Sequence, residues 1–358
     1  MTQTALAEAA GVSRQAYAAI ERSVATPSTE IALRLAVALG STVEALFRLP
    51  DQPRPALQAR LTESAPIAQT GPVLANVERV GGQWTARPHG GSALHPAILR
   101  SFPVANGVII DGSDPSSATV ELLDAPDRDA VVATGCDPAM SIVAAHLRSQ
   151  GIALAWHEMG SKASLAGLAA GHAHIAGCHL LDEESGLYNT PWVERSLPFP
   201  ATVVTFAVWD QGIVVAPGNP KQVRGVEDLA RPGLLMVNRE EGSGSRALLD
   251  AGLARAGIET ASVAGYHRVA TSHLSVAEAV GMGLADAGIA VRAAAIALGL
   301  GFVPLGQERY DLVIPDRFLN LPEIQRLLAS LRDPALRRRI ELLGGYDVAS
   351  MGMEPSAA

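Results

Sequence analysis

Cysteine is scarce in this chain of 358 residues, and long apolar runs are absent. Cys136 and Cys178 are too few for a disulfide framework, and we expect both to be free thiols in a reducing compartment. No run of about 18 apolar residues without charge is present, so no membrane span is predicted. The N-terminus also lacks the basic and then apolar pattern of a secretory signal. We therefore expect a cytoplasmic protein.

The motifs of common enzymes are missing as well. Gly-Ser-Gly-Ser-Arg at 242–246 differs from the Gly-x-Ser-x-Gly of serine hydrolases. The sequence also shows no pattern typical of a catalytic triad of Ser, His and an acidic residue. A Gly-x-x-x-x-Gly-Lys-Ser/Thr phosphate loop is also absent. We therefore expect a binding protein that is not an enzyme and holds no cofactor.

The first 47 residues predict short helices around a tight turn. One helix runs from Thr4 to Ala10 and stops at Gly11, and Ser13 is a good N-cap for the next. Two such helices form a helix-turn-helix unit, whose second helix enters the DNA major groove. An ordinary helical hairpin with a solvated polar turn has the same spacing.

The order of residues favours the helix-turn-helix over an ordinary helical hairpin. Four runs closely resemble the lambda-repressor-like (XRE, or Cro/C1) DNA-binding domain: Leu6–Gln15, Ile20–Arg22, Pro27-Ser28 and Ala32–Gly40. The resemblance implies an all-α head with base contacts from Arg14, Gln15 and Ala18 and phosphate contacts from Gln3 and Ser13. That family begins with a further helix, so the resemblance implies a misassigned start or a missing first helix.

The charge of this head bears on how it binds DNA. The chain carries a net charge of −8, yet residues 1–50 hold four arginines and four glutamates and are neutral. A neutral head gains little from phosphate contacts alone. We therefore expect two heads per complex, and hence a homodimer on double-stranded operator DNA.

Residues 51–127 are predicted to be a linker with one β-hairpin. Pro50, Pro53 and Pro55 mark its start, and residues 73–87 alternate around a turn at Gly81-Gly82. Because an isolated hairpin needs a partner surface, this hairpin is the expected dimer interface. The segment from Pro88 to Pro126 is expected to be an ordered connector.

From Ala130 the sequence alternates between strands and helices, which predicts an α/β domain with parallel strands. Four loops between a strand and a helix carry Ser or Thr at the helix start, and the first three also carry Gly: 134–137, 160–161, 242–245 and 271–272. Such a helix start can bind an anion through its backbone N–H groups. A Ser or Thr at this place is more often only an N-cap.

A second resemblance rests on two motifs, residues 160–178 and 276–289. They are similar to the type II periplasmic-binding-protein fold, in the version of the molybdate-type binding proteins. The resemblance implies a two-lobed domain at 128–350, with lobe 1 at 128–207 and 303–350, lobe 2 at 208–302, and a tail at 351–358. It implies an oxyanion, molybdate or tungstate first, held by Cys136, Asp137, Ser161, Ser243, Gly244, Ser245, Ser272 and Tyr310.

Two charged residues depart from the neutral shell that this resemblance implies. Arg246 either binds the oxyanion bidentately or braces its own loop. Asp137 would repel a dianion, so we expect it to cap its own helix.

Alternative functions stay open for both the ligand-binding domain and the N-terminal helices. A sensor of an organic anion would use the same loops, and a soft metal ion would use Cys136, Cys178 and His179. No Cys-x-x-Cys or His-x-x-x-His spacing supports a metal site, and none is predicted. In a third alternative, the N-terminal helices only dimerise a solute-binding protein or an enzyme.

Overall fold

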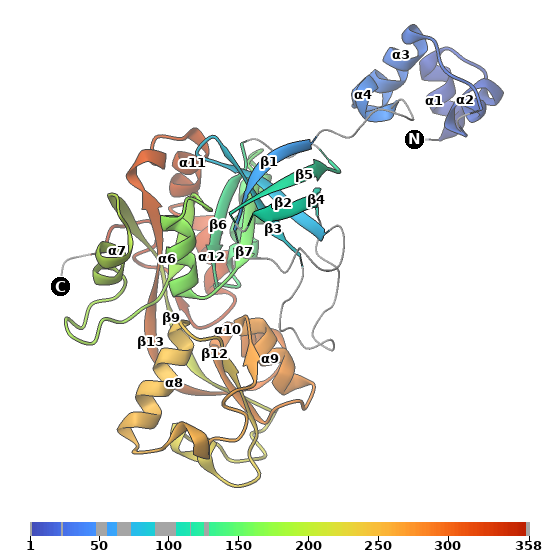
Figure 1. The fold of residues 1–358 in the computed structure, drawn as a ribbon. Helices are drawn as coiled ribbons and strands as arrows, with labels where there is room; N and C mark the ends of the chain where they lie inside the picture. Colours follow the sequence, from blue (N-terminus) through green and yellow to red (C-terminus); the bar gives the residue numbers. More distant parts are fainter. Residues whose placement is uncertain are drawn as a thin grey trace. The chain divides into compact units, whose positions relative to one another are not determined.

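The computed structural model describes residues 2–22, 24–47, 56–62, 73–89, 105–114, 116–124 and 129–355. The chain divides into two compact units, Met1–Pro55 and Ala56–Ala358. Figure 1 labels the elements of both. Pro50, Pro53 and Pro55, which are expected to mark a linker, lie outside the described residues. No described helix is both long enough and apolar enough to span a bilayer.

The first unit is helical. It contains α1 (Gln3–Ala10), α2 (Arg14–Glu21), α3 (Thr29–Leu39) and α4 (Val43–Leu46). Gly11 adopts the left-handed conformation that ends α1, and the Ser13 hydroxyl accepts the Ala16 N–H at the start of α2. Leu6, Ala10 and Leu35 form the buried centre of this small core. The predicted pair of helices around the turn is therefore confirmed.

The second unit begins with a closed five-stranded β-barrel. Its strands are β1 (Ala56–Leu61), β2 (Val73–Val80), β3 (Gln83–Pro88), β4 (Gly107–Asp114) and β5 (Ser117–Leu122), in the order β1-β3-β2-β4-β5. The predicted hairpin is confirmed as β2 and β3, with Val80 opposite Gln83. Gly81 and Gly82 both have positive φ, as a two-residue hairpin turn of this type requires.

The barrel corrects the prediction that residues 51–127 are a linker. Alternate side chains of all five strands point inward and bury a common core that includes Val77, Ile109 and Val120. The hairpin therefore has its partner surface within its own barrel, which removes the reason for expecting it at a dimer interface. Part of the expected connector from Pro88 to Pro126 forms β4 and β5, and residues 90–104 lie outside the described part of the chain.

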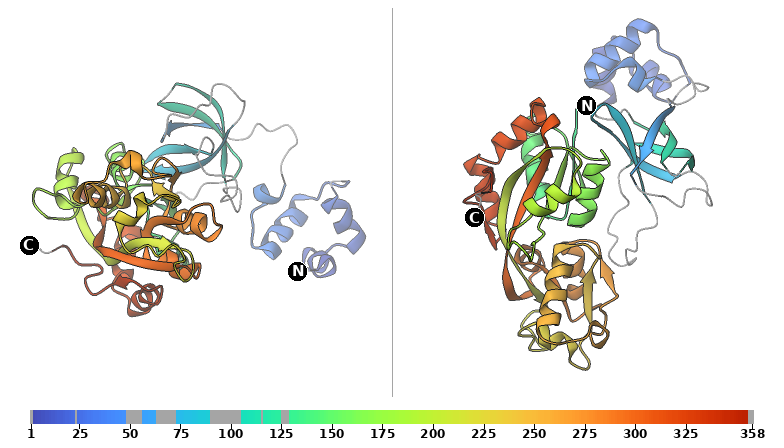
Figure 2. Two further views of the ribbon diagram at one scale, coloured as in Figure 1. Left: turned by 90° about the horizontal axis from the view of Figure 1, so that it is seen from below. Right: turned by 60° about the vertical axis from the view of Figure 1, so that its left-hand side comes forward.

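The rest of the second unit has two lobes, which are seen from three directions in Figures 1 and 2. One lobe contains β6 (Val131–Gly135), α5 (Met140–Arg148), β7 (Leu154–Glu158), α6 (Ser161–Ala169), β8 (Ile175–Cys178), α7 (Thr190–Ser196), η4 (Asp316–Phe318), α11 (Pro322–Ser330), α12 (Pro334–Glu341) and β14 (Tyr346–Asp347). The other contains η2 (Val226–Ala230), β10 (Met236–Arg239), α8 (Gly244–Arg255), η3 (Thr260–Ser262), β11 (Val269–Ala270), α9 (His273–Gly281), β12 (Ala287–Val291) and α10 (Arg292–Ala297).

Two 15-residue strands, β9 (Ala201–Val215) and β13 (Gly301–Pro315), pass through both lobes. They pair with each other antiparallel along their whole length, within the strand order β11-β10-β12-β9-β13-β8-β6-β7. The outer strands of each lobe are parallel, as predicted, but β9 and β13 make the sheet mixed. The expected lobe boundaries at 207/208 and 302/303 fall inside these two strands.

The described end of the chain is part of this domain. The Thr205 N–H of β9 donates to the Met353 carbonyl at 2.8 Å, and Met351 is fully buried. Residues 351–353 therefore pack on lobe 1, which corrects the prediction that a tail begins at 351.

Prediction for His174. The Val132 N–H donates to Nδ1 of His174 at 3.0 Å, and burial lowers the pKa of His174 to about 4. Between pH 6.5 and 4 the unfolded chain binds more protons at this residue than the folded chain, so stability falls as the pH falls through that window. We expect His174→Asn to flatten this loss by up to about 1.4 kcal/mol per pH unit, measured by urea unfolding. The exposed His267→Asn is the matched control, and an equal pH slope in wild type and His174→Asn would contradict the assignment.

Candidate functional site

The head presents the first turn of α2 to solvent. Arg14 and Gln15 are exposed there, where a recognition helix contacts base edges. Gln3 instead donates to the Glu21 carboxylate at 2.6 Å, across the two helices. In this state Gln3 fixes α1 to α2, and Ser13 acts as a helix cap.

In the two-lobed domain, polar residues gather where the parallel strands end. Cys136 follows β6, His179 follows β8, Arg239 ends β10, and His273 comes three residues after β11. The carboxyl ends of parallel strands are where open α/β sheets bind ligands. All four side chains are buried. Cys136 and His179 belong to lobe 1, whereas Arg239 and His273 belong to lobe 2.

Cys136, His179 and Glu308 form a hydrogen-bonded chain. The Cys136 Sγ lies 3.2 Å from Nε2 of His179, and Nδ1 of the same ring lies 2.7 Å from the Glu308 carboxylate on β13. Burial alone lowers the pKa of His179, but the Cys136 and Glu308 side chains raise it to about 10. The Tyr310 hydroxyl accepts the Cys136 N–H at 3.2 Å and so fixes the start of this loop.

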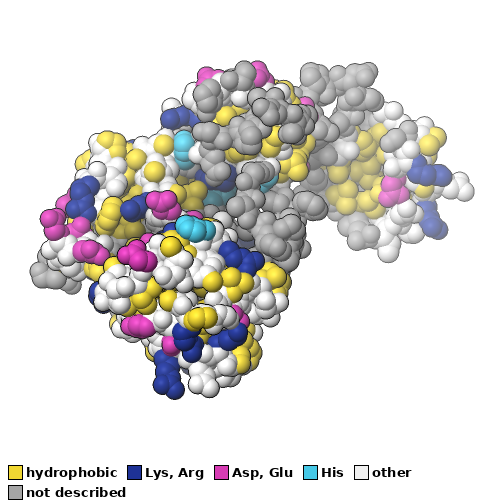
Figure 3. All heavy atoms as spheres, turned by 60° about the horizontal axis from the view of Figure 1, so that its bottom comes forward, with side chains coloured by type: hydrophobic (Ala, Val, Ile, Leu, Met, Phe, Trp, Pro, Cys, Tyr) yellow, Lys and Arg dark blue, Asp and Glu magenta, His cyan; other side chains and the backbone are white. Residues whose placement is uncertain are grey.

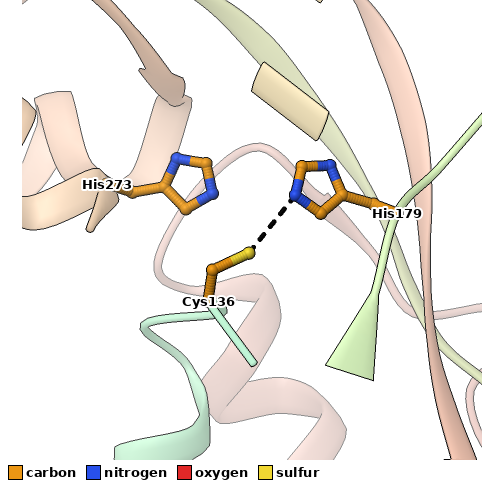
Figure 4. A group of neighbouring side chains, drawn as sticks. All are labelled: Cys136, His179 and His273. Atoms are coloured by element: carbon orange, nitrogen blue, oxygen red, sulfur yellow. Dashed lines mark hydrogen bonds between the residues drawn. The ribbon is translucent and has the colours of Figure 1, made fainter. Parts of the chain in front are cut away.

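His273 stands opposite this chain, at the first position of α9. Figure 4 shows its ring facing Cys136 and His179, and ligand atoms of the three residues lie within 4.8 Å of one another. Its side chain is fully buried, and neither ring nitrogen has a hydrogen-bond partner among the described residues. Burial lowers the pKa of His273 well below its ordinary value, and the Arg239 charge lowers it further, so the ring is neutral.

Arg239 places a buried positive charge beside these residues. Its guanidinium donates twice to Glu240, at 2.8 Å each, and once to the Thr271 carbonyl at 3.2 Å. Its Nη1 is buried and lacks an acceptor within the described part of the chain, as does the indole Nε1 of Trp209. The Trp209 ring lies 5.3 Å from the ring of His273, the residue on which the Arg239 charge also acts.

The two lobes touch directly around this site. The Lys162 N–H at the start of α6 donates to the Gly242 carbonyl at 3.3 Å, which joins lobe 1 to lobe 2. Gly244 at the start of α8 packs so tightly on the ring of His179 that a Cβ there would collide with it. The structure therefore shows the lobes closed on each other.

The structure brings the predicted ligand residues to this region but turns several of them away from it. Ser161 accepts the His179 N–H at 3.2 Å, and Ser245 accepts the Gln211 side-chain amide at 3.1 Å, so both lie at the site. Ser243 and Ser272 cap α8 and α9, which is the alternative role expected for such residues.

Asp137 and Arg246 serve the local structure. Asp137 accepts the Ala139 N–H and the Tyr346 hydroxyl, both at 2.7 Å, and burial raises its pKa to about 7. Arg246 stacks on the Tyr266 ring, pairs with Asp250 and donates to the Arg239 carbonyl. Of its two possible roles, Arg246 therefore has the bracing one in this structure.

Sequence reasoning missed Arg239, His273, Glu308 and Trp209. A signal for two of them was present, because Arg239 and His273 lie at the same strand ends that pointed to the serines. Trp209 and Glu308 stand inside β9 and β13, where neighbouring residues gave no sign that the two strands cross between the lobes.

The fold and this site define a class of protein: a helix-turn-helix head followed by a two-lobed ligand-binding domain. Residues 1–46 match the family model of the helix-turn-helix, and residues 144–332 match that of the PBP superfamily domain. The chain belongs to the PBP superfamily, and it carries a DNA-binding domain of the helix-turn-helix type. The two domains together support a ligand-responsive regulator.

Relatives of this chain include two uncharacterized proteins. YvgK of Bacillus subtilis is 35% identical over 231 residues, which are 63% of this chain and 74% of that protein. A Clostridium pasteurianum protein encoded in the 5′ region of a 2Fe-2S ferredoxin gene is 36% identical over 106 residues, 29% of this chain and 94% of its own length.

Solved structures with a similar fold are more distant in sequence. A phosphate transporter substrate-binding protein of Clostridium perfringens, solved with bound phosphate, is 12% identical with a TM-score of 0.47, over 63% of this chain and all of its own. The molybdate-binding protein of Azotobacter vinelandii is 16% identical with a TM-score of 0.45, over 61% of this chain and 98% of its own. At these scores neither bears on the ligand.

Prediction for Arg14. We expect Arg14→Ala to weaken specific operator binding by about 1–3 kcal/mol and to relax base preference at one position in each half-site, because a bidentate pair with guanine is lost. The measurement is a binding assay over a randomised operator. Arg34→Ala is the matched control, because Arg34 pairs with Glu30 on α3. Unchanged binding by Arg14→Ala would refute the recognition-helix assignment, and an equal loss on every sequence would assign Arg14 to phosphate.

Proposed function

We propose that this protein is a transcription regulator whose DNA binding is controlled by a small oxyanion held between the two lobes, molybdate or tungstate first. The head would read operator DNA as one of a pair, with half-sites about 34–36 Å apart. On the face drawn in Figure 3, acidic and basic side chains are interspersed and not gathered by sign. Sedimentation of the complex with operator DNA would show how many chains, and therefore how many heads, bind each operator.

The observation that supports an anion is the unpaired guanidinium nitrogen of Arg239. A buried donor without an acceptor costs roughly 1–3 kcal/mol, and a ligand that brings acceptor oxygens would remove that cost. The Trp209 indole N–H is a second such donor. An anion with several equivalent oxygens and no proton of its own matches this excess of donors.

A protonated anion would need an acceptor as well. The Gln211 side-chain oxygen is buried and unpartnered among the described residues, and so is the acceptor nitrogen of the neutral His273 ring, so such a ligand would find acceptors here as well. Phosphate and small organic acids therefore belong in the same test as molybdate, tungstate and sulfate. The rank order of the stabilisation by these ligands shows whether the unpaired donors or the unpaired acceptors of the site decide which ligand binds.

Strand β7 supports a route from the ligand site to the barrel that follows the head in sequence. His157 on this strand lies 2.6 Å from the Glu78 carboxylate on β2 of the barrel. The next residue, Glu158, has its pKa raised by burial and lowered in turn by the charge of Arg239 in lobe 2. Neighbouring residues of one strand thus meet a partner in the barrel and a charge of the opposite lobe. Closure of the lobes would act on the barrel through this strand.

Prediction for Arg239. Thermal-shift measurements on the full chain with a chelator present should show the largest stabilisation by molybdate or tungstate, and a ligand at 100 times its Kd adds about 2.7 kcal/mol. We expect Arg239→Gln to abolish this shift because it removes the charge and the unpaired donor. Arg246→Gln is the matched control and should keep the shift, although it lowers the stability of the free protein. Equal thermal shifts in Arg239→Gln and wild type would overturn the anion site. A larger shift with a carboxylate or phosphate than with molybdate or tungstate would make that anion the proposed ligand instead.

Prediction for Glu78. We expect Glu78→Gln to leave ligand binding unchanged but to reduce the effect of the ligand on operator affinity, because it removes the charge that His157 meets in the barrel. Allosteric coupling commonly amounts to a factor of 5–150, and most of that factor should disappear. DNA affinity is measured with and without ligand. The exposed Glu183→Gln serves as control, and full coupling in Glu78→Gln would exclude this route.

A further inference from the structure

Cys136, His179 and His273 meet at one point between the lobes, and each offers a ligand atom that transition metals prefer. Thiolate and imidazole are the ligands of zinc, copper and similar ions. The three side chains are 1%, 1% and 0% exposed, so the place is shielded from water in the closed state. The Sγ of Cys136 and Nε2 of His179 are 3.2 Å apart, and tetrahedral bonds to one Zn²⁺ would place them about 3.6 Å apart, so a small displacement would admit the ion.

The surroundings of His179 match those of a metal-bound histidine. A ligating histidine almost always donates its second ring N–H to a carboxylate or a carbonyl, which fixes its tautomer and orientation. Here Nδ1 of His179 meets the Glu308 carboxylate at 2.7 Å, which leaves Nε2 toward Cys136. Glu308 itself stands on β13, in the ladder that joins the lobes.

The presence of His273 favours a metal site over a site with a nucleophilic cysteine. A Cys–His–carboxylate chain also occurs in enzymes that use a thiolate nucleophile, but that chemistry needs no second imidazole. The ring of His273 is buried, faces the other two residues, and has no partner for either nitrogen in the described ranges (Figure 4). A metal ion would satisfy one of these nitrogens.

We propose that Cys136, His179 and His273 form a binding site for a borderline or soft transition-metal cation, Zn²⁺ being the probe of first choice. The ion would join lobe 1 to lobe 2, because His273 comes from lobe 2 and the other two ligands from lobe 1. Three protein ligands leave a fourth tetrahedral position open. This site differs from the predicted set of Cys136, Cys178 and His179: Cys178 lies within β8, and His273 takes its place.

The test uses the full chain, stripped with chelator and titrated with Co²⁺, whose absorption reports both tetrahedral geometry and thiolate bonding. We expect one Co²⁺ per chain with a sulfur-to-cobalt charge-transfer band, and one Zn²⁺ per chain by equilibrium dialysis. Cys136→Ala should lose the charge-transfer band, and Cys178→Ala, the matched cysteine control, should keep it. Glu308→Gln should keep the band but weaken binding by about 10–100-fold.

His273→Gln is the second ligand variant and keeps the proposal falsifiable if Cys136→Ala does not fold, which circular dichroism would show. We expect it to weaken Co²⁺ binding and change the absorption bands, while His267→Gln binds like wild type. Failure of the wild type to bind one ion per chain, or wild-type binding by either ligand variant, would overturn the proposal. The oxyanion panel is run with chelator on metal-free protein, so the two results are separate and failure of one leaves the other standing.

Discussion

The antiparallel ladder between β9 and β13 is the constraint on which the two-lobed domain depends. It runs from the pair Gly301 and Val215 in one lobe to Pro315 and Ala201 in the other, with register shifts after Pro304 and Tyr310. Trp209, Gln211, Glu308 and Tyr310 all stand on this ladder. Its two strands therefore form the floor of the candidate site, and the loops of each lobe close over it. A movement of the lobes must bend the same strands that hold these side chains.

Burial gives the site much of its chemical character. In water, a histidine beside a thiol and a carboxylate would exchange hydrogen bonds with solvent, and the guanidinium of Arg239 would be fully hydrated. Between closed lobes, each polar atom must find its partner in the protein or in a ligand. Among the described residues, Cys136, His179 and Glu308 satisfy one another without a ligand, whereas Nη1 of Arg239 and both ring nitrogens of His273 lack a partner. An anion would satisfy Arg239, and a metal ion would satisfy His273 while replacing the hydrogen bond between Cys136 and His179.

The sequence predicted elements whose signals are local. Ser13 as a cap, the hairpin around Gly81-Gly82 and the buried strand before Cys136 depend on neighbouring residues only. β13 was missed because Pro304, Gly306 and three charged residues interrupt its apolar pattern, and a bulge between Pro304 and Gly306 accommodates the proline. The barrel was missed because β1, the pair β2 and β3 and the pair β4 and β5 are separated along the chain, so their common core is not visible in any local pattern. Arg239 and Arg246 are seven residues apart, and only the fold shows that the first faces the opposite lobe while the second stacks on Tyr266.

Tyr310 occupies space that two glycines leave open. Its hydroxyl, which accepts the Cys136 N–H, lies where a Cβ on Gly135 or Gly177 would be; Gly177 is on the neighbouring strand β8 and Gly135 on β6, one strand further. A side chain at either glycine would push the tyrosine out and release the loop that carries the thiol. In the descent of such proteins a side chain at either glycine therefore requires that the tyrosine be lost first. Loss of the tyrosine frees Gly177, whose near neighbours are all atoms of that side chain, whereas Gly135 stays confined by Trp156 and by its positive φ.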